Sequence, residues 1–212
     1  MDALLLDLDG TLLDDRTAVR TALNAFLSAN RCELDGPQAL VRWRKLADMH
    51  WRRFERGETS FEDQRRFRVR EFLGIAMSDS EADAAFDSYR TAYENAWMLF
   101  PECVRFLERT AHLPKVVVTN GDKAQQLLKV SRCGLANHLT AVVTPMDCGA
   151  WKPDHRIFLA AVERLGLPVA RCMMIGDDME RDIRPARELG LLTYHVDRND
   201  PAASLLHAIK EI

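Results

Sequence analysis

The sequence lacks any apolar segment long enough to cross a membrane. Its apolar N-terminal run is only four residues long and follows the acidic Asp2, whereas a spanning helix needs about 20 apolar residues. A secretory signal would combine a basic start with a longer apolar segment. These absences predict a cytoplasmic protein without a membrane partner.

Cysteine spacing gives no sign of a disulfide framework or of a zinc site. The chain has five cysteines, an odd number, with no CxxC pair and no histidine at zinc-finger spacing. We predict reduced and mostly buried thiols at Cys32, Cys103, Cys133, Cys148 and Cys172.

Neither sign of charge is in large excess, since the formal net charge is -3 over 212 residues. With 47% hydrophobic and 29% charged residues, the composition is that of a globular protein. The length suits one large domain or a domain that carries an insert. Basic residues outnumber acidic ones only locally, by ten to six between residues 41 and 71. We therefore expect no nucleic-acid partner.

Five short apolar runs predict buried strands, because they are aliphatic and separated by turn-forming or helical segments. Segments with helical periodicity lie between the later runs. One of these predicted helices has its apolar positions at Ala124, Leu127, Leu128 and Val130. Alternating strands and helices predict an α/β fold with a Rossmann-like parallel sheet. The predicted strands lie within residues 3–9, 115–120, 139–144, 172–177 and 191–196.

Residues 14–98 contain no such strand and follow helical periodicity instead. The four predicted helices cover residues 15–30, 38–56, 60–73 and 80–97. We therefore predict an all-helical domain at 14–98, inserted into an α/β core formed by residues 1–13 and 99–212.

Polar motifs stand where the predicted strands end. Asp7 and Asp9 end the first strand, and because alternate side chains of a strand point the same way, we expect both carboxylates to face one spot. The other motifs follow later strands, and the carboxyl ends of parallel strands meet at one edge. These motifs are Thr119-Asn120-Gly121, Lys152-Pro153, and Gly176-Asp177-Asp178 with Asp182.

Such a site would concentrate negative charge, since two carboxylates about 4 Å apart repel by roughly 4 kcal/mol at an effective dielectric near 20. Carboxylate and carbonyl oxygens without histidine or cysteine suit Mg²⁺, which commonly shares a phosphate oxygen. The Thr119 hydroxyl, the amides of Asn120 and Gly121, and the Lys152 ammonium are groups that bind phosphate. The sequence therefore predicts Mg²⁺ as cofactor and a phosphorylated ligand.

The four motifs, in this order, resemble those of the haloacid dehalogenase-like hydrolase superfamily. They are Asp7-Leu8-Asp9-Gly10-Thr11, Thr119-Asn120-Gly121, Lys152-Pro153, and Gly176-Asp177 through Asp182. The helical insert resembles the C1-type cap of this superfamily, a lid over the site. Its sequence is similar to the branch that holds pyrimidine 5′-nucleotidases and acylneuraminate 9-phosphatases.

The resemblance implies a role for each motif residue. Asp7 would be the nucleophile that forms an aspartyl-phosphate, and Asp9 would be the general acid and base. Mg²⁺ would be bound by Asp7, Asp177 and the backbone carbonyl of Asp9. Lys152, Thr119 and the amides of Asn120 and Gly121 would hold the phosphoryl group, while Asp178 and Asp182 would orient Lys152 or metal-bound water.

The activity implied is a Mg²⁺-dependent phosphatase acting on a small phosphorylated metabolite, a nucleotide or a sugar phosphate. Asp9 argues against the dehalogenases of the superfamily, which lack this second aspartate. A phosphomutase of the β-phosphoglucomutase type stays open, as does a phosphonate hydrolase, which would need a lysine from the insert, where Lys45 is the only one. The oligomeric state is not predicted.

The insert itself offers two further possibilities. Trp43, Trp51 or Phe54 could stack on a base or sugar, and Arg52 or Arg53 could meet an anion, although aromatic residues at helical spacing more often form a core. An RNA-binding or protein-binding module built on the arginine-rich insert is the alternative of a different class.

Overall fold

A computed structural model describes residues 1–200 and 202–211. The chain forms two compact units, one of Met1–Asp15 with Met98–Ile212 and one of Arg16–Trp97. The predicted core range 99–212 includes positions 201 and 212, which lie outside the described residues. The assignment of the two units as domains of separate function stays a prediction.

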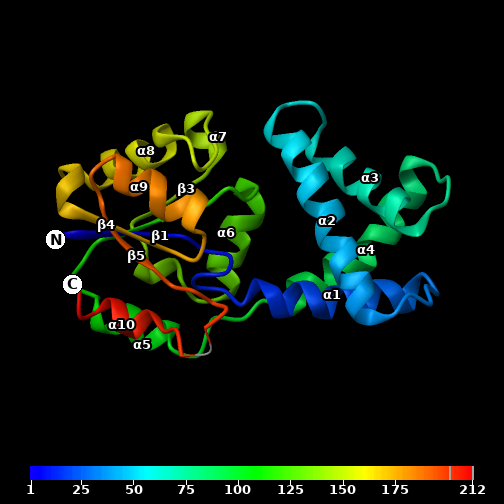
Figure 1. The fold of residues 1–212 in the computed structure, drawn as a ribbon, viewed down its shortest axis with the longest axis horizontal. Coiled ribbons are helices and arrows are strands. Elements are labelled where there is room, and N and C mark those ends of the chain that lie inside the picture. Colours follow the sequence, from blue (N-terminus) through cyan, green and yellow to red (C-terminus); the bar gives the residue numbers. More distant parts are fainter. Residues whose placement is uncertain (201, 212) are drawn as a thin grey trace. The chain divides into compact units, whose positions relative to one another are not determined.

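The first unit is built on a five-stranded sheet in which every neighbouring pair is parallel. The strand order is β3-β2-β1-β4-β5 (Figure 1). The chain adds β2 and β3 on one side of β1 before it adds β4 and β5 on the other side. A ligand crevice is expected where the strand order reverses in this way, beside the carboxyl end of β1. The strands are β1 (Ala3–Leu6), β2 (Lys115–Val118), β3 (Ala141–Val143), β4 (Cys172–Gly176) and β5 (Leu192–His195).

Helices cover both faces of this sheet. In Figure 1, α8 (His155–Leu165) and α9 (Arg184–Glu188) lie on one side, and α5 (Cys103–Arg109) and α10 (Leu205–Ala208) lie on the other. Alternate residues of β1, Ala3 and Leu5, are fully buried in the same cluster as Phe158 of α8. The prediction of an α/β fold with a parallel sheet and inserted helices is confirmed.

Each predicted strand contains an observed one, but three helices are missing from the prediction. These are α5, α7 (Pro145–Cys148) and α10, with seven, four and four residues. Helices of one or two turns are too short to show a clear apolar period. Short helical turns also occur at Ala136–His138, Val169–Arg171 and Met179–Ile183.

Helix α6 (Lys123–Arg132) is confirmed as a helix, but of the four apolar positions predicted to define its face only Val130 is buried. Leu127 and Leu128 are 46% and 37% exposed. The buried side chains are Gln126, Lys129 and Val130. Two polar residues can occupy a buried helix face only where other groups satisfy them, and here those groups are the Asp9 carboxylate and the Thr119 hydroxyl.

The second unit consists of four helices that match the four predicted ones to within two residues. Ser60 and Ser78 cap α3 and α4 by accepting hydrogen bonds from backbone amides three residues later. The helices are α1 (Asp15–Ala29, which begins in the first unit), α2 (Gly36–Glu55), α3 (Phe61–Leu73) and α4 (Asp79–Asn95).

An aromatic cluster fills the interior of this helical unit. The Trp43 ring lies 4.9 Å from Phe26, 5.2 Å from Phe72 and 4.6 Å from Tyr89, centroid to centroid, and its side chain is 1% exposed. Trp43 is therefore a core residue. No helix among residues 1–200 and 202–211 combines the length and apolarity that a bilayer crossing requires.

The cysteines of the chain are all free thiols, as predicted. Only Cys103 and Cys172 are buried, whereas Cys32, Cys133 and Cys148 are partly exposed. The prediction that most of them are buried is therefore wrong.

Candidate active site

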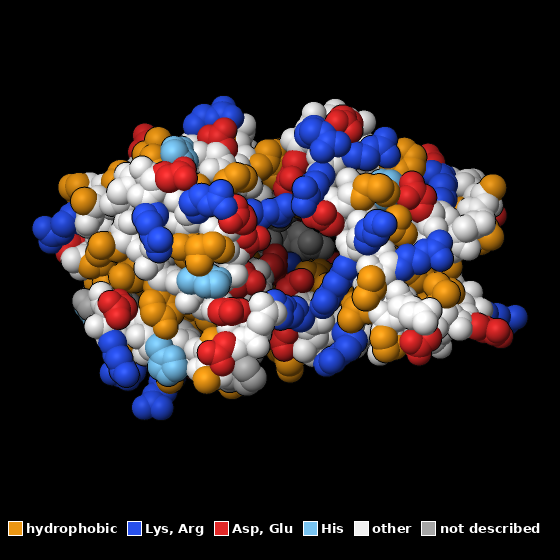
Figure 2. Space-filling view, in the orientation of Figure 1, with side chains coloured by type: hydrophobic (Ala, Val, Ile, Leu, Met, Phe, Trp, Pro, Cys, Tyr) orange, Lys and Arg blue, Asp and Glu red, His pale blue; other side chains and the backbone are white. Residues whose placement is uncertain are grey.

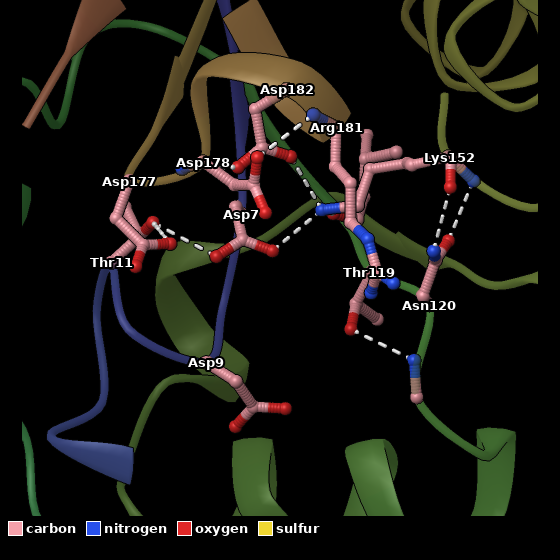
Figure 3. A network of polar contacts seen from close by, with 12 residues as sticks. Asp7, Asp9, Thr11, Thr119, Asn120, Lys152, Asp177, Asp178, Arg181 and Asp182 are labelled. Atoms are coloured by element: carbon pink, nitrogen blue, oxygen red, sulfur yellow. Dashed lines mark hydrogen bonds and ion pairs between the residues drawn. The ribbon is translucent and has the colours of Figure 1, made fainter. Parts of the chain in front are cut away.

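The carboxyl ends of β1, β2 and β4 bring most of the predicted site residues together in the first unit (Figure 3). Asp7 follows β1, and its backbone N–H donates to the carbonyl of Ile175 in β4 at 2.9 Å. Thr119 follows β2, and Asp177 follows β4. The parallel register of the three strands therefore places these side chains at one edge of the sheet.

The Lys152 ammonium lies at the centre of the site. Its Nζ atom is 2.6 Å from Asp7 Oδ1, 2.7 Å from Asp182 Oδ1 and 2.9 Å from the carbonyl oxygen of Val118. Burial by itself lowers the pKa of Lys152, but the carboxylates of Asp182 and Asp7 outweigh that effect and raise the pKa above its ordinary value. The group is therefore charged and compensates both carboxylates.

Asn120 fixes the loop that carries Lys152. The Asn120 side chain donates from Nδ2 to the Lys152 carbonyl at 2.9 Å and accepts from the Lys152 backbone N–H at 2.6 Å. The Lys152–Pro153 peptide bond is cis. The Asn120 side chain thus connects the end of β2 to this loop. The sequence predicts a function only for the backbone amide of Asn120.

Three carboxylates share the site with this one ammonium. One oxygen each of Asp7, Asp177 and Asp182 lie within 4.8 Å of one another. Burial, and then the charge of Asp7, raise the pKa of Asp177. Burial also raises the pKa of Asp182, against the opposing effect of Lys152.

This arrangement fits a divalent cation. Fully ionised, the three aspartates and Lys152 leave an excess of two negative charges, which a divalent cation would neutralise. A cluster made only of hard carboxylate oxygens suits Mg²⁺. Donors from the protein already bind both oxygens of Asp182 and both oxygens of Asp7. Asp177 is the one member of the cluster that is not buried, so its carboxylate is the most accessible to a cation.

The loop after β1 is shaped to admit Asp177. Gly10 has φ +90, and a Cβ atom added to it would lie 2.4 Å from Asp177 Oδ2. The Thr11 hydroxyl donates to Asp7 Oδ2 at 2.8 Å and is 3.4 Å from Asp177 Oδ1. Thr11 was not predicted as a site residue, although its place in the first motif is the signal that could have identified it.

Asp9 does not point to the same spot as Asp7, so the expectation drawn from strand alternation is wrong. Strand β1 ends at Leu6, and the chain turns at Gly10, so the two-residue period does not extend to Asp9. In Figure 3 the Asp9 carboxylate lies apart from the three clustered aspartates. Its oxygens are bound by Gln126 Nε2 and Lys129 Nζ, each at 2.7 Å.

The remaining predicted residues have definite partners. The Asp178 carboxylate caps the turn that follows β4, accepting from the amides of Glu180 and Arg181 at 2.8 and 3.0 Å. Its own amide donates to Asp182 Oδ2 at 3.2 Å. The Gly121 amide donates to the Thr119 hydroxyl at 3.1 Å.

The sequence reasoning missed Gln126 and Lys129. Both are polar residues three positions apart on the helix that follows the Thr119-Asn120-Gly121 motif, and they therefore lie on one face of it. Two polar residues at that spacing, so soon after a proposed phosphate-binding motif, were the available signal.

A family model for haloacid dehalogenase-like hydrolases matches residues 1–190. Three curated relatives are similar over part of the chain. They are the phosphoserine phosphatase of Thermus thermophilus, 36% identical over 112 residues (50% of this chain and 45% of the relative), the pyrimidine 5′-nucleotidase YjjG of Escherichia coli, 36% over 78 residues (36% and 35%), and the human N-acylneuraminate-9-phosphatase, 32% over 85 residues (40% and 34%). The chain thus spans less than half the length of each of these relatives.

Solved structures agree in fold over nearly the whole chain. YfnB of Bacillus subtilis, described as a HAD-hydrolase bound to magnesium, has a TM-score of 0.78 at 23% identity, and the match covers 100% of this chain and 99% of YfnB. The L-2-haloacid dehalogenase of Xanthobacter autotrophicus has a TM-score of 0.74 at 22% identity, covering 95% and 79%. At these identities the likeness shows the fold alone.

Proposed function

The chain belongs to the haloacid dehalogenase-like hydrolases, and from this premise we propose that it is a Mg²⁺-dependent phosphatase of small phosphomonoesters. The observation that carries the proposal is the cluster of Asp7, Asp177 and Asp182 around the buried Lys152 at the carboxyl edge of the sheet. A single cluster thus joins a carboxylate nucleophile, a site for a divalent cation and a fixed positive charge.

Asp7 acts as the nucleophile. One of its carboxylate oxygens attacks phosphorus, the bond from phosphorus to the alcohol oxygen breaks, and an aspartyl-phosphate forms. The ammonium of Lys152 and the hydroxyl of Thr11 each bind one Asp7 oxygen, which orients the carboxylate. Bound Mg²⁺ would supply charge stabilisation for the transferring phosphoryl oxygens.

Asp9 moves the proton. It donates a proton to the departing alcohol oxygen in the first step, then accepts one from the water that attacks the aspartyl-phosphate, which releases phosphate and regenerates Asp7. The Thr119 hydroxyl and the Asn120 amide hold phosphoryl oxygens. The Gly121 amide, for which the sequence predicts the same role, donates to the Thr119 hydroxyl instead. In this scheme Asp178 and Asp182 act by orienting Lys152 and the turn after β4.

The substrate class follows from the relatives and from Asp9. By name, the three relatives act on phosphoserine, a pyrimidine nucleotide and N-acylneuraminate 9-phosphate, all small phosphomonoesters. We propose that this chain takes a nucleotide or a sugar phosphate. Asp9 favours phosphoryl transfer over dehalogenation, although the Xanthobacter dehalogenase, with a TM-score of 0.74, is nearly as similar in fold as YfnB, with 0.78.

Two of the alternatives receive little support from the helical unit. Lys45 is exposed, whereas a lysine that forms a Schiff base is normally activated by desolvation or by another cation. Several arginines there are paired with carboxylates, as Arg66 is with Asp63 and Asp83. Figure 2 shows both basic and acidic side chains on the face of the helical unit that it presents. Such pairing leaves little net charge for RNA.

The proposal predicts phosphate release that requires both Mg²⁺ and Asp7. Purified protein is assayed with nucleoside monophosphates, sugar phosphates and phosphonates, with and without Mg²⁺, by measuring inorganic phosphate. Asp7→Asn should show no turnover, because an amide is a poor nucleophile towards phosphorus. Asp2→Asn, at the opposite end of β1 and paired with Arg171, is the matched control and should retain activity.

Equal turnover by Asp7→Asn and the unsubstituted protein would refute the assignment. A phosphomutase would instead show slow phosphate release and rapid transfer between two hydroxyls of one sugar when a sugar bisphosphate is added.

A further inference from the structure

Two side chains of α6 hold the Asp9 carboxylate. Lys129 Nζ lies 2.7 Å from Asp9 Oδ1, and Gln126 Nε2 lies 2.7 Å from Asp9 Oδ2. The Lys129 side chain is 2% exposed and Gln126 is 1% exposed, whereas the Asp9 side chain is 28% exposed. Both carboxylate oxygens are therefore fixed from the protein side, and the group still reaches solvent.

Gln126 also binds Thr119. Its Nε2 atom donates to Thr119 Oγ1 at 2.8 Å, so its two N–H groups bind Asp9 and Thr119 at the same time. In the reverse amide orientation Oε1 would take the place of Nε2, and Gln126 would donate to neither Asp9 nor Thr119. The Asp9 and Thr119 oxygens consequently lie within two hydrogen-bond lengths of each other.

The direction of the Thr119 proton follows from the same contacts. The Thr119 hydroxyl accepts from Gln126 and from the Gly121 amide, which lies 3.1 Å away. A hydroxyl has two acceptor lone pairs and one proton. With both lone pairs in use, the proton is directed to a third group, and a phosphoryl oxygen would be such an acceptor.

The neighbouring backbone leaves room for this amide. A Cβ atom on Gly121 would lie 1.8 Å from Gln126 Nε2 and 2.4 Å from its Cδ. Gly121 therefore permits the close approach of Gln126 to Thr119. Helix α6 also exposes Leu127 and Leu128 while it buries Gln126 and Lys129, an orientation that simple hydrophobic burial does not favour.

From these contacts we infer that Gln126 and Lys129 are positioning residues for the proton transfer by Asp9. The inference rests on the proposed function. Lys129 restrains the carboxylate, and Gln126 fixes its distance from the Thr119 hydroxyl. A phosphoryl group whose oxygen accepts from Thr119 then presents its leaving-group oxygen to Asp9.

Leaving groups of different basicity separate this role from a purely structural one. An alkyl phosphate needs a proton on its departing alkoxide, whereas 4-nitrophenyl phosphate releases a stable phenolate that needs none. We therefore compare kcat/KM for one alkyl phosphate that the protein hydrolyses and for 4-nitrophenyl phosphate, because this parameter reports on the steps up to phosphoryl transfer to Asp7.

Lys129→Met should lower kcat/KM for the alkyl phosphate by roughly 10- to 100-fold more than for the aryl phosphate. Lys129→Arg, which keeps the charge, should restore part of the alkyl activity. Gln126→Leu should lower both activities, with the greater loss on the alkyl phosphate, because it also releases Thr119. Lys123→Met and Gln125→Leu, on the same helix, are the matched controls and should retain both activities.

Equal losses on the two substrates in Lys129→Met would overturn the inference, and so would unchanged activity on both. Melting temperatures of all variants are measured alongside, and Lys129→Arg supplies a charge-preserving variant should Lys129→Met not fold. The proposed function fails separately if Asp7→Asn remains active. Absence of turnover by the unsubstituted protein would overturn both proposals.

Discussion

At the scale of single residues, Gly10 shows how a backbone requirement and a functional contact coincide. Its φ of +90 lies in the left-handed region, which disfavours residues with a Cβ atom. The absent side chain also leaves space for the Asp177 carboxylate, 2.4 Å from where a Cβ would stand. Gly10 therefore allows the approach of Asp177 to the loop after β1.

Gly10→Ala should destabilise the fold and weaken Mg²⁺ binding. The backbone conformation alone costs about 1 to 2 kcal/mol with a Cβ present, and the methyl group would displace Asp177. We expect a lower free energy of unfolding in urea and a larger dissociation constant for Mg²⁺ by calorimetry.

Gly134→Ala is the matched control, since Gly134 has φ +71 but no atom within 4 Å of its would-be Cβ. It should lose a similar free energy of unfolding and bind Mg²⁺ as the unsubstituted protein does. Unaltered Mg²⁺ affinity in Gly10→Ala would show that Asp177 does not depend on this space.

At the scale of helices and strands, the position of a helix in the sequence and the face that it buries depend on different interactions. The apolar positions of α6 predict a helix correctly, yet the buried face carries Gln126 and Lys129. Strand β1 gives a second example, because the alternation of side-chain direction from Ala3 to Leu6 does not extend to Asp9. Partners from other elements decide which side chains a helix can bury.

In α2, His50 is a polar residue on a buried face. Its side chain is fully buried, its ring is stacked on Phe67, and Nε2 lies 3.3 Å from Glu71 Oε1. Burial lowers the pKa of His50, and the charges of Arg53 and Arg68 act in the same direction, while Glu71 opposes them. The folded protein therefore holds this imidazole neutral at a pH where the unfolded chain begins to protonate it.

His50→Phe should reduce the loss of stability on acidification. Below pH 6.5, the ordinary value for histidine, the unfolded chain binds a proton that the folded protein resists, so stability falls until the lowered pKa is reached. The effect is at most about 1.4 kcal/mol for each pH unit in that window. Free energies of unfolding in urea at pH 7.5 and 5.5, for both proteins, measure it.

His138→Phe is a control, because His138 lies outside the helical unit, in the short turn Ala136–His138. An equal fall in stability between pH 7.5 and 5.5 in the His50 variant and the unsubstituted protein would contradict the expected role of His50.

At the scale of the whole molecule, the sheet order decides which charges meet. Strand β1 lies between β2 and β4, so residues from four distant parts of the sequence form one site. The resulting cluster carries more carboxylates than cations. Burial, and to a smaller extent the neighbouring carboxylates, raise the pKa values of Asp177 and Asp182.

Mg²⁺ should therefore raise the melting temperature, and by more at pH 8 than at pH 6. Groups whose folded pKa is raised contribute stability at low pH and lose it as pH rises above the ordinary 3.8 towards neutrality. A cation that replaces those protons restores stability where the carboxylates are ionised. Melting curves with and without Mg²⁺ at the two pH values give the comparison.

Asp177→Asn should remove most of the gain from Mg²⁺, whereas Asp2→Asn should retain it. A gain that is equal at pH 6 and pH 8 would argue against competition between protons and the cation.

Much of the fold was accessible from the sequence because it depends on local properties. The aliphatic runs around Leu5 and Val117 mark strands wherever they occur, and the spacing of Leu23, Phe26 and Leu27 marks a helix face. The four motifs could be assigned to one sheet edge because parallel strands share the direction of their carboxyl ends. The short helices α5, α7 and α10 gave too few turns to be recognised.

The sequence by itself thus determined the strands, the four helices of the insert and the order of the motifs, since each depends on residues close together in the chain. Only the tertiary structure decided that Lys129 binds Asp9 across 120 positions, that Lys152 lies between Asp7 and Asp182, and that Asp9 turns away from the other carboxylates. These contacts depend on how helices and loops from separate segments pack around β1. Local periodicity carries no information about that packing.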